Sequence, residues 1–585
     1  MSAVVVDGPI GSAPAADVPL LHIEGLDVCL PSGADRSLAV DGASLALSAN
    51  EILCVVGESG SGKSLTARAV MGLLPGPLVR VTGGAIRLVG EDLVQASAAR
   101  MRAVRGAEIS MVFQEPMTAL NPVMRIGAQI DEVIRFHASL SRRARRERAR
   151  ELVADVGLPD PERILSAYPH ELSGGQRQRA MIAMALAMEP KVLIADEPTT
   201  ALDVTTQARI LDLIKGLQAS HDTGVLFITH DFGVVDDIAD RVAVMQHGKV
   251  VEIGTTAKVL GAPEHPYTRA LIGAVPSLVP RPRRTISSES LLVGRGLVKV
   301  YGGGRGLFGR RGSAGTRALD GVDFELHRGE TLGVVGESGS GKSTLARAVV
   351  RLIEPDAGAL HYRGTDLLAL DRAGMRAHRA GLQMVFQDPY GSLNPRSRVG
   401  RIIADGPVTL GTPRPEAERR ARAMLELVGL EARAFERFPH EFSGGQRQRI
   451  GIARALALEP EILVADEPVS ALDVSVQAQV LELFARIREE LGLSMIFITH
   501  DLRVAAQVCD RIAVMRLGKV VECGPTAELF ERASHEYTRE LLAAVPGRSW
   551  GMAGDAVAST RDQSRSARHS RPPISNSRQI HGRRS

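Results

Sequence analysis

The sequence contains few cysteines, few aromatic residues and no long hydrophobic run. Its 585 residues include 4 cysteines and 1 tryptophan, and aromatic residues make up 3% of the chain. The cysteines are scattered without a CxxC spacing, which argues against a disulfide framework and against a zinc site. They are Cys29, Cys54, Cys509 and Cys523. No apolar run reaches the ~18–20 residues that span a bilayer. No basic segment precedes the short apolar patch near the N-terminus, so we expect a cytoplasmic protein without a signal peptide.

A strong charge of one sign is also absent from most of the chain. The formal net charge is +4, but residues 547–585 alone hold eight Arg and two Asp. This C-terminal segment is rich in Ser, Arg and Pro and poor in apolar residues, so it cannot bury enough apolar surface to offset the entropy lost on ordering. We therefore expect a disordered Arg/Ser-rich tail. Contact of the tail with a membrane surface or with nucleic acid is the less favoured alternative.

The chain contains an internal duplication. SGGQRQR occurs at 173–179 and again at 443–449, and 22 of 31 positions are identical between 168–198 and 438–468. GESGSGKS at 57–64 also returns from 336, and ADEPTTALDV at 195–204 returns as ADEPVSALDV from 465. This period is far longer than the ~20–50 residues of a solenoid repeat, so we expect two similar domains. The predicted segments are a flexible N-terminus at 1–19, a first domain at 20–276, a linker at 277–290, a second domain at 291–546 and the tail at 547–585.

Each copy predicts an α/β domain. EILCVVGESGSGKSLTARAV and TLGVVGESGSGKSTLARAV each indicate a buried strand, a Gly-rich turn and a helix, and KVLIADEP and VLFITHD indicate further buried strands. Apolar strands that alternate with helices are typical of a mostly parallel sheet with helices on both faces. The charged stretch between FQEP and SGGQ predicts a separate helical subdomain.

The Gly-rich turns match G-x-x-x-x-G-K-[ST], a loop whose backbone N–H groups surround phosphates. We expect Lys63 and Lys342 to reach the β- and γ-phosphates, and Ser64 and Ser343 to coordinate Mg²⁺. The loop residues predicted to bind the nucleotide are Gly57, Glu58, Ser59, Gly60, Ser61, Gly62, Lys63, Ser64, Gly336, Glu337, Ser338, Gly339, Ser340, Gly341, Lys342, Ser343 and Thr344.

Acidic residues end the next buried strand in each copy. Asp196 and Asp466 can hold Mg²⁺, and Glu197 and Glu467 can polarise the water that attacks the γ-phosphate. One acid pair could simply cap a strand, but two pairs downstream of two phosphate loops favour catalysis. A histidine ends the strand that follows, where we expect it to sense the γ-phosphate rather than to be purely structural. These histidines are His230 and His500.

The Ser-Gly-Gly-Gln corner opens a helix, and the N–H groups and dipole of a helix start suit the open side of a phosphate site. With this corner, the chain resembles the ATP-binding-cassette ATPases over roughly residues 20–546, because all these motifs occur in order and twice. The resemblance implies two P-loop NTPase domains in tandem, the first and second cassettes, each with a RecA-like core and a helical subdomain. It also implies an intramolecular head-to-tail dimer in which each signature covers the other cassette's phosphate loop. The signature residues expected at ATP are Ser173, Gly174, Gly175 and Gln176 over Lys342, and Ser443, Gly444, Gly445 and Gln446 over Lys63.

The same resemblance implies ATP and Mg²⁺ as cofactors and completes the predicted sites. Asp203 and Asp473 match the loop that couples the two sites across the interface. The predicted catalytic residues are Glu197, Glu467, His230, His500, Gln114 and Gln387, and the predicted Mg²⁺ ligands are Ser64, Gln114, Asp196, Ser343, Gln387 and Asp466. Tyr301 matches the residue that stacks on adenine in the second cassette, whereas Leu30 stands at the corresponding place in the first.

Finer features look like the oligopeptide, dipeptide and nickel importers, in a fused form similar to the ATP-binding proteins of glutathione import. They are FQEPMTALNP and FQDPYGSLNP, ALDVTTQ and ALDVSVQ, and HPYTRALIGAVP and HEYTRELLAAVPG. The implied partners are two integral-membrane permeases and a substrate-binding protein, with no nucleic acid. The chain would then lie on the inner face of the cell membrane, with permease helices docked near Met117 and Tyr390. No iron–sulfur cluster is expected, because no Cys follows Cys523 and none lies between 55 and 508.

A second function class stays open at this point. Ribosome-associated translation factors are also built from two such cassettes, but they carry a long, basic, helical linker between them. The linker predicted here, residues 277–290, is short and within the range of ordinary domain connections. The motifs therefore favour a transport ATPase that powers uptake of peptides or similar small solutes.

Overall fold

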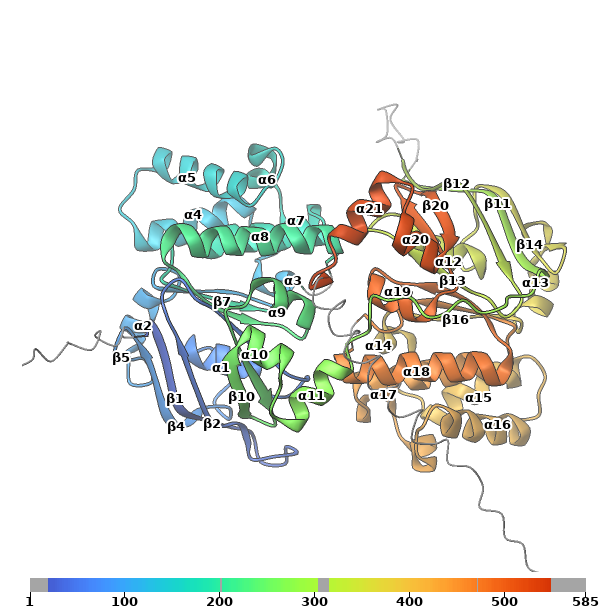
Figure 1. The fold of residues 1–585 in the computed structure, drawn as a ribbon, viewed down its shortest axis with the longest axis horizontal. Coiled ribbons are helices and arrows are strands. Elements are labelled where there is room, and N and C mark those ends of the chain that lie inside the picture. The colour runs from blue at the N-terminus through green and yellow to red at the C-terminus, as the bar shows by residue number, and fades with distance from the viewer. Residues whose placement is uncertain (1–18, 200–201, 303–314, 471, 549–585) are drawn as a thin grey trace, which may run out of the picture.

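We describe a computed structural model, which covers residues 19–199, 202–302, 315–470 and 472–548 (Figure 1). The predicted flexible N-terminus and Arg/Ser-rich tail lie almost entirely outside these residues. No helix in the described part of the chain is long and apolar enough to cross a membrane.

The first cassette contains two sheets. The strands are β1 (Leu21–Cys29), β2 (Leu38–Leu47), β3 (Ile52–Val56), β4 (Val81–Leu88), β5 (Glu91–Asp92), β6 (Ile109–Val112), β7 (Val192–Asp196), β8 (Gly224–Ile228), β9 (Arg241–Gln246) and β10 (Lys249–Thr255). A six-stranded sheet has the order β10-β9-β3-β8-β7-β6, and only β10 is antiparallel in it. A separate antiparallel sheet has the order β2-β1-β4-β5. The predicted parallel sheet is therefore confirmed, while the antiparallel sheet is an addition that the sequence motifs did not indicate.

Helices cover the six-stranded sheet and form the predicted helical subdomain. In the first cassette they are α1 (Lys63–Val70), α2 (Ala98–Val104), α3 (Pro116–Ala119), α4 (Ile126–His137), α5 (Arg142–Asp155), α6 (Pro161–Ser166), α7 (Gly174–Ala185), α8 (Val204–His221), α9 (Phe232–Ile238), α10 (Thr256–Gly261) and α11 (Pro266–Gly273). The five residues of β3 are all buried and alternate between two cores. Leu53 and Val55 face the core around α1 and the antiparallel sheet, and Ile52, Cys54 and Val56 face the core beneath the other helices. A strand buried on both faces has to be a continuous apolar run, as its sequence is.

The second cassette repeats this architecture. Its strands are β11 (Ser290–Tyr301), β12 (Thr316–His327), β13 (Thr331–Val335), β14 (Ala357–Tyr362), β15 (Thr365–Asp366), β16 (Leu382–Val385), β17 (Ile462–Asp466), β18 (Ser494–Ile498), β19 (Arg511–Arg516) and β20 (Lys519–Pro525). Its helices are α12 (Lys342–Val349), α13 (Arg372–His378), α14 (Pro389–Ser392), α15 (Val399–Thr409), α16 (Arg414–Leu427), α17 (Gly444–Leu456), α18 (Val474–Leu491), α19 (Leu502–Val508), α20 (Thr526–Arg532) and α21 (Glu536–Ala543). The sheet orders are β12-β11-β14-β15 and β16-β17-β18-β13-β19-β20.

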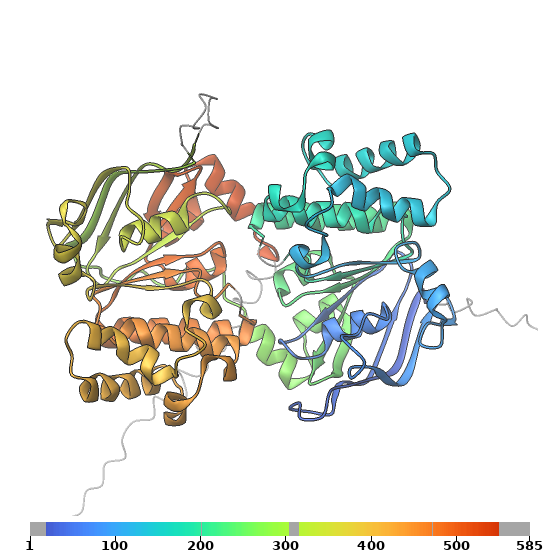
Figure 2. The same ribbon diagram turned by 180° about the vertical axis from the view of Figure 1, so that it is seen from behind.

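The two cassettes lie side by side in opposite orientations. In both views α8 of the first cassette lies beside α21 of the second, and α11 of the first lies beside α18 of the second (Figures 1 and 2). The segment that joins the cassettes follows the surface of the second one. Gln507 donates from Nε2 to the carbonyls of Ser277 and Val279 at 2.9 and 2.8 Å, and Arg284 forms a salt bridge with Asp510 at 2.6 Å.

Candidate functional site

The two phosphate loops have nearly the same conformation. Gly57, Gly60 and Gly62 have φ values of 149°, 75° and 107°, against 150°, 81° and 107° in the second loop. A Cβ atom on Gly57 would lie 2.2 Å from the carbonyl oxygen of Met245, so only glycine fits there. Lys63 is buried and donates from Nζ to the carbonyls of Gly57 and Glu58 at 2.6 and 2.9 Å. Each loop therefore positions its lysine against its own backbone.

Oxygen atoms that suit Mg²⁺ converge beside each loop. The Ser64 hydroxyl donates to Asp196 at 2.8 Å, and the Ser343 hydroxyl donates to Asp466 at 3.0 Å. Both aspartates end a fully buried strand, β7 or β17. Burial raises the pKa of both carboxyl groups. The hydrogen bond from the serine lowers it by less, so the net shift is upward. A hydroxyl and a carboxylate held together in this way fit a hard cation with oxygen ligands.

Gln, Glu and His side chains meet in each cassette. Gln114 donates from Nε2 to Glu197 at 2.9 Å, and His230 Nδ1 lies 3.4 Å from the same carboxylate. In the second cassette Gln387 donates from Nε2 to Glu467 at 2.9 Å, and His500 Nδ1 lies 3.3 Å from the carboxylate of Glu467. The three sequence motifs, which are spread over more than 100 residues, thus come together in the same arrangement twice.

The backbone at each glutamate is strained. Glu197 and Glu467 have φ values of 48° and 46°, in the left-handed region that residues other than glycine rarely adopt. A backbone hydrogen bond holds each glutamate in this conformation. The N–H of Glu197 donates to the carbonyl of Ile228 at 2.9 Å, and the N–H of Glu467 donates to the carbonyl of Ile498 at 3.0 Å. Such strain concentrates at functional positions.

The histidine and glutamate of the second site form a charged pair. Burial lowers the pKa of His500, but the hydrogen bond and charge of Glu467 raise it by more, so the net shift is upward. Burial raises the pKa of Glu467, but His500, Lys342 and Gln387 lower it by more. The pKa of His230 is likewise raised, with burial opposed by Glu197. Each arrangement therefore favours imidazolium facing carboxylate.

The signature corners cap their helices. Ser173 Oγ accepts from the N–H of Gln176 at 3.3 Å, and Gln176 Oε1 accepts from the N–H of Ser173 at 3.0 Å. Ser443 and Gln446 form the same reciprocal pair at the start of α17. The two side chains are thus used to fix the helix start, and the two glycines between them carry the open N–H groups. A Cβ atom on Gly174 or Gly444 would meet no other atom within 4 Å.

The loops after the acid pairs cross the interface. The Ser59 N–H of the first phosphate loop donates to Asp473 of the second cassette at 2.7 Å. Ser475 donates to Glu58, and Thr205 of the first cassette donates to Glu337 of the second. Each phosphate loop is therefore hydrogen-bonded to the opposite cassette. The two serine and threonine partners were not predicted, although they lie two residues after the predicted aspartates.

A cavity of about 440 Å³ lies in front of Lys342. Its walls combine groups of the second cassette, including Ser338, Gln387, Glu467 and Gly444, with Leu202 and Asp203 of the first. Among the described residues that line it, the wall from the first cassette comes from the loop at Asp203 and not from Ser173–Gln176. That each signature closes over the opposite phosphate loop remains a prediction.

Two tyrosines at the sites were missed from the sequence. Tyr267 and Tyr537 accept at their hydroxyls from the N–H groups of Glu58 and Glu337, each at 3.1 Å. Burial raises the pKa of both phenols to about 12, so they stay neutral. The signal was present, because both tyrosines belong to the repeated HPYT and HEYT stretches. Their distance of about 200 residues from the loops concealed the contact.

The structure also places the side chains predicted to stack on adenine or to receive permease helices. Tyr301 ends β11 and is 43% exposed, whereas Leu30 packs partly buried against the first core. Met117 and Tyr390 are 50% and 66% exposed, and the guanidinium of Arg447 lies over the Tyr390 ring at 3.8 Å. The side chains of Met117 and Tyr390 are therefore accessible to a partner.

Two protein-family models match the chain. The ABC transporter model matches residues 40–200 and 319–470, and the model of the oligopeptide/dipeptide transporter C-terminal region matches residues 251–295 and 521–560. The chain belongs to the oligopeptide/dipeptide family of ABC transporters. It is a fused two-cassette ATPase that binds ATP and hydrolyses it to drive transport. This match decides in favour of the transport class over the translation-factor class.

Individual proteins show the same relationship. The chain is 48% identical over 529 residues to the peptidoglycan transport ATP-binding protein YejF of Agrobacterium fabrum, across 90% of this chain and 96% of that protein. It is 47% identical over 558 residues to the glutathione import ATP-binding protein GsiA of Escherichia coli O157:H7, across 90% and 89%. The solved dimeric bacterial ABC transporter cassette MJ0796 aligns with a TM-score of 0.37 and 28% identity, over 40% of this chain and 99% of that one. The family models and the relatives YejF and GsiA show that this chain is the ATP-binding subunit of an ABC importer.

Proposed function

We propose that this chain powers the uptake of short peptides or peptide-derived solutes through two composite ATP sites. The observation that carries the proposal is the duplicated meeting of Gln, Glu and His beside a buried phosphate-loop lysine. The solute class is supported by the relatives, whose names give peptidoglycan transport and glutathione import.

The glutamates act as general bases in this proposal. Glu197 and Glu467 each accept from a glutamine amide at 2.9 Å, which orients the carboxylate that accepts a proton from the attacking water. The neighbouring histidine holds the carboxylate ionised and has its second ring nitrogen free of that contact, so it can donate to the γ-phosphate. Lys63 and Lys342 exchange their contacts with loop carbonyls for phosphate oxygens when the nucleotide binds.

Mg²⁺ fits the hydroxyl and carboxylate pairs beside the loops. Ser64 and Asp196 would hold the ion in the first cassette, and Ser343 and Asp466 in the second, with the glutamine carbonyl as a further ligand. The ion supplies charge neutralisation at the β- and γ-phosphates. Burial raises the pKa of both aspartates, and a bound cation would offset this cost of burying their charge.

We infer that two permeases dock beside Met117 and Tyr390, which would place the chain on the inner face of the cell membrane, together with a substrate-binding protein. The exposed side chains at these two equivalent places support this assignment. Each lies three residues after a catalytic glutamine, so movement of a docked helix reaches the nucleotide site through one short segment.

Uptake measurements test the proposal. Cells that lack the chain should lose uptake of labelled di- and tripeptides or of glutathione, and the intact chain should restore it. The Glu197→Gln, Glu467→Gln double variant, which keeps the size of both side chains, is the matched control and should not restore uptake. Normal uptake of all these solutes in the deletion strain would refute the solute class. Uptake restored by the double variant would refute the catalytic roles.

A further inference from the structure

Each cassette extends a short C-terminal arm onto the other one. The first arm, residues 275–279, lies on α19 of the second cassette, where Gln507 donates to two of its carbonyls. The second arm, residues 545–547, crosses to α9 of the first cassette. There Gly233 packs against Pro546 so closely that an added Cβ atom would lie 2.5 Å from the Pro546 carbonyl oxygen.

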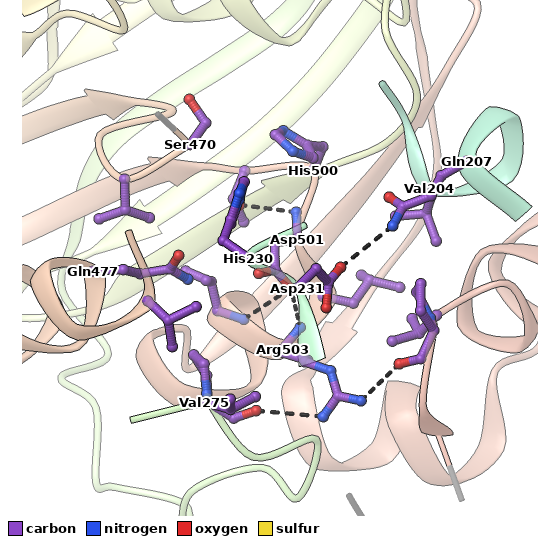
Figure 3. A pocket seen from close by; sticks show the side chains of 18 of the residues that line it. Val204, Gln207, His230, Asp231, Val275, Ser470, Gln477, His500, Asp501 and Arg503 are labelled. Atoms are coloured by element: carbon purple, nitrogen blue, oxygen red, sulfur yellow. Dashed lines mark hydrogen bonds between the residues drawn. The ribbon is translucent and has the colours of Figure 1, made fainter. Parts of the chain in front are cut away.

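One side chain contacts both arms. Arg503 is only 6% exposed and lies beside Asp231 and Asp501 in a pocket lined by both cassettes (Figure 3). Its Nη2 donates to the carbonyls of Pro546 and Gly547 at 2.7 and 2.9 Å, and its Nη1 lies 3.5 Å from the carbonyl of Pro276. A buried guanidinium needs such partners, and carbonyls from two different cassettes supply them here.

The position of Arg503 links the arms to the catalytic histidines. Arg503 lies three residues after His500, and Asp501 caps the start of α19 by accepting from the Arg503 N–H at 2.8 Å. In the first cassette the residue three after His230 is Gly233, the one against which the second arm packs. The two helix starts that follow the histidines are therefore joined through the arms. A cavity of about 140 Å³, lined by His230, His500 and Arg503, lies between them.

We propose that Arg503 is a positioning residue that holds the two C-terminal arms together, and so keeps the cassettes in one relative orientation before ATP binds. Both composite sites use loops of the opposite cassette, so their affinity for ATP depends on this orientation. Cleavage of the γ-phosphate bond uses the Gln, Glu and His side chains of one cassette, so its rate depends less on the relative orientation of the two cassettes. Loss of the contact should therefore raise KM for ATP and leave kcat nearly unchanged.

Two variants remove the contact from opposite sides. Arg503→Ala deletes the donors, and Gly233→Ala displaces the second arm without touching the guanidinium. Each should raise KM for ATP about ten-fold with kcat changed less than about two-fold, as expected for charged hydrogen bonds worth about 1.4 kcal/mol. Arg503→Lys, which keeps one donor group, should fall between the parent and Arg503→Ala. Gly273→Ala, where an added Cβ meets no atom within 4 Å, and Arg486→Ala, which loses a carbonyl contact within one cassette, are the controls.

A distance measurement without nucleotide tests the orientation directly and does not depend on the transported solute. Spin labels on Leu73→Cys and Leu352→Cys report the separation of the cassettes, in a background where Cys29 and Cys523 are Ser. Arg503→Ala and Gly233→Ala should broaden the distance distribution, and the controls should leave it narrow. An unchanged distribution with unchanged KM in a folded Gly233→Ala variant would overturn the proposal. A fall in kcat at constant KM and distance in Arg503→Ala would also overturn it, since that would assign Arg503 to the chemical step.

Discussion

The two ATP sites should differ in affinity, because Tyr301 has no aromatic counterpart in the first cassette. Gly25 and Gly296 have matching φ values of 54° and 56°, and Leu30 and Tyr301 each lie five residues after them. The two strands are therefore equivalent in conformation up to the point where one presents an exposed ring and the other a partly buried leucine.

The size of the difference follows from stacking. An aromatic side chain under a base contributes about 1–3 kcal/mol in nucleic-acid binding, and every 1.4 kcal/mol is ten-fold. The site at Lys63 should therefore bind ATP about five-fold to a hundred-fold more weakly than the site at Lys342. Arg36, which donates to the carbonyl of Gly60 in the first phosphate loop, is a charged group that can offset part of this loss. Its planar guanidinium can also stack on a base, which would bring the ratio toward the lower limit.

Nucleotide titrations of blocked chains measure the ratio. Lys342→Ala leaves the first site for titration, and Lys63→Ala leaves the second. In these backgrounds Leu30→Tyr should tighten the first site, and Tyr301→Leu should weaken the second by the same factor. Equal affinities of the two sites in the otherwise unchanged chain would refute the reasoning. If Leu30→Tyr had no effect while Tyr301→Leu weakened binding, a different residue of the first cassette would contact the base.

Further predictions concern the catalytic pairs and the surface. Glu197→Gln and Glu467→Gln should each slow steady-state ATP hydrolysis at least about ten-fold while ATP binding persists, because the base is lost and the shape is kept; full hydrolysis in either would remove that residue from the mechanism. The pKa of His500 is raised and that of Glu467 lowered, from usual values of 6.5 and 4.5. Their pairing therefore stabilises the fold most between those values and is lost as pH rises through the raised histidine pKa. His500→Gln should accordingly lower Tm more at pH 6 than at pH 9, and a pH-independent difference would contradict the pairing. Met117→Arg and Tyr390→Arg should keep basal ATPase activity and lose recovery with membranes, because an unpaired charge is costly in a buried interface; normal recovery would place docking elsewhere.

The nucleotide chemistry could be predicted from the sequence because it depends on contiguous motifs. Gly57, Lys63 and Ser64 lie within eight residues, and a strand before and a helix after them set the loop geometry. The contacts of Tyr267 with the loop at Glu58, and of Ser475 with Glu58, join segments more than 200 residues apart. Neither residue type has a chemistry that demands such a partner. Only the packing of α11 and of the opposite cassette brings them there.

The antiparallel sheet illustrates a second limit. Strand β1 alternates buried and partly buried residues, as a half-buried strand should, but its pattern is broken at Gly25. There a left-handed residue shifts the register against both β2 and β4. Such a bulge adds one residue to one strand, so the period-2 pattern changes phase in the middle of the strand. A sequence search for uninterrupted alternation of apolar and polar residues therefore finds a short apolar patch instead of the whole strand of nine residues.

Fusion of the cassettes explains why Arg503 and Gly233 can differ. In a dimer of identical chains, the residue two positions after each Asp cap would be the same on both sides of the axis. Two arginines would then bring like charges together and compete for the same buried space, and an arginine at Gly233 would have to displace Pro546, which already leaves no room for a Cβ atom. Two glycines would leave the carbonyls of the second arm without the donor they now have. A single chain with one arginine and one glycine satisfies both arms. The interface residues can therefore differ between the cassettes while the predicted catalytic residues stay the same. The predicted catalytic residues face the ATP site of their own cassette, whereas the interface residues face the other cassette.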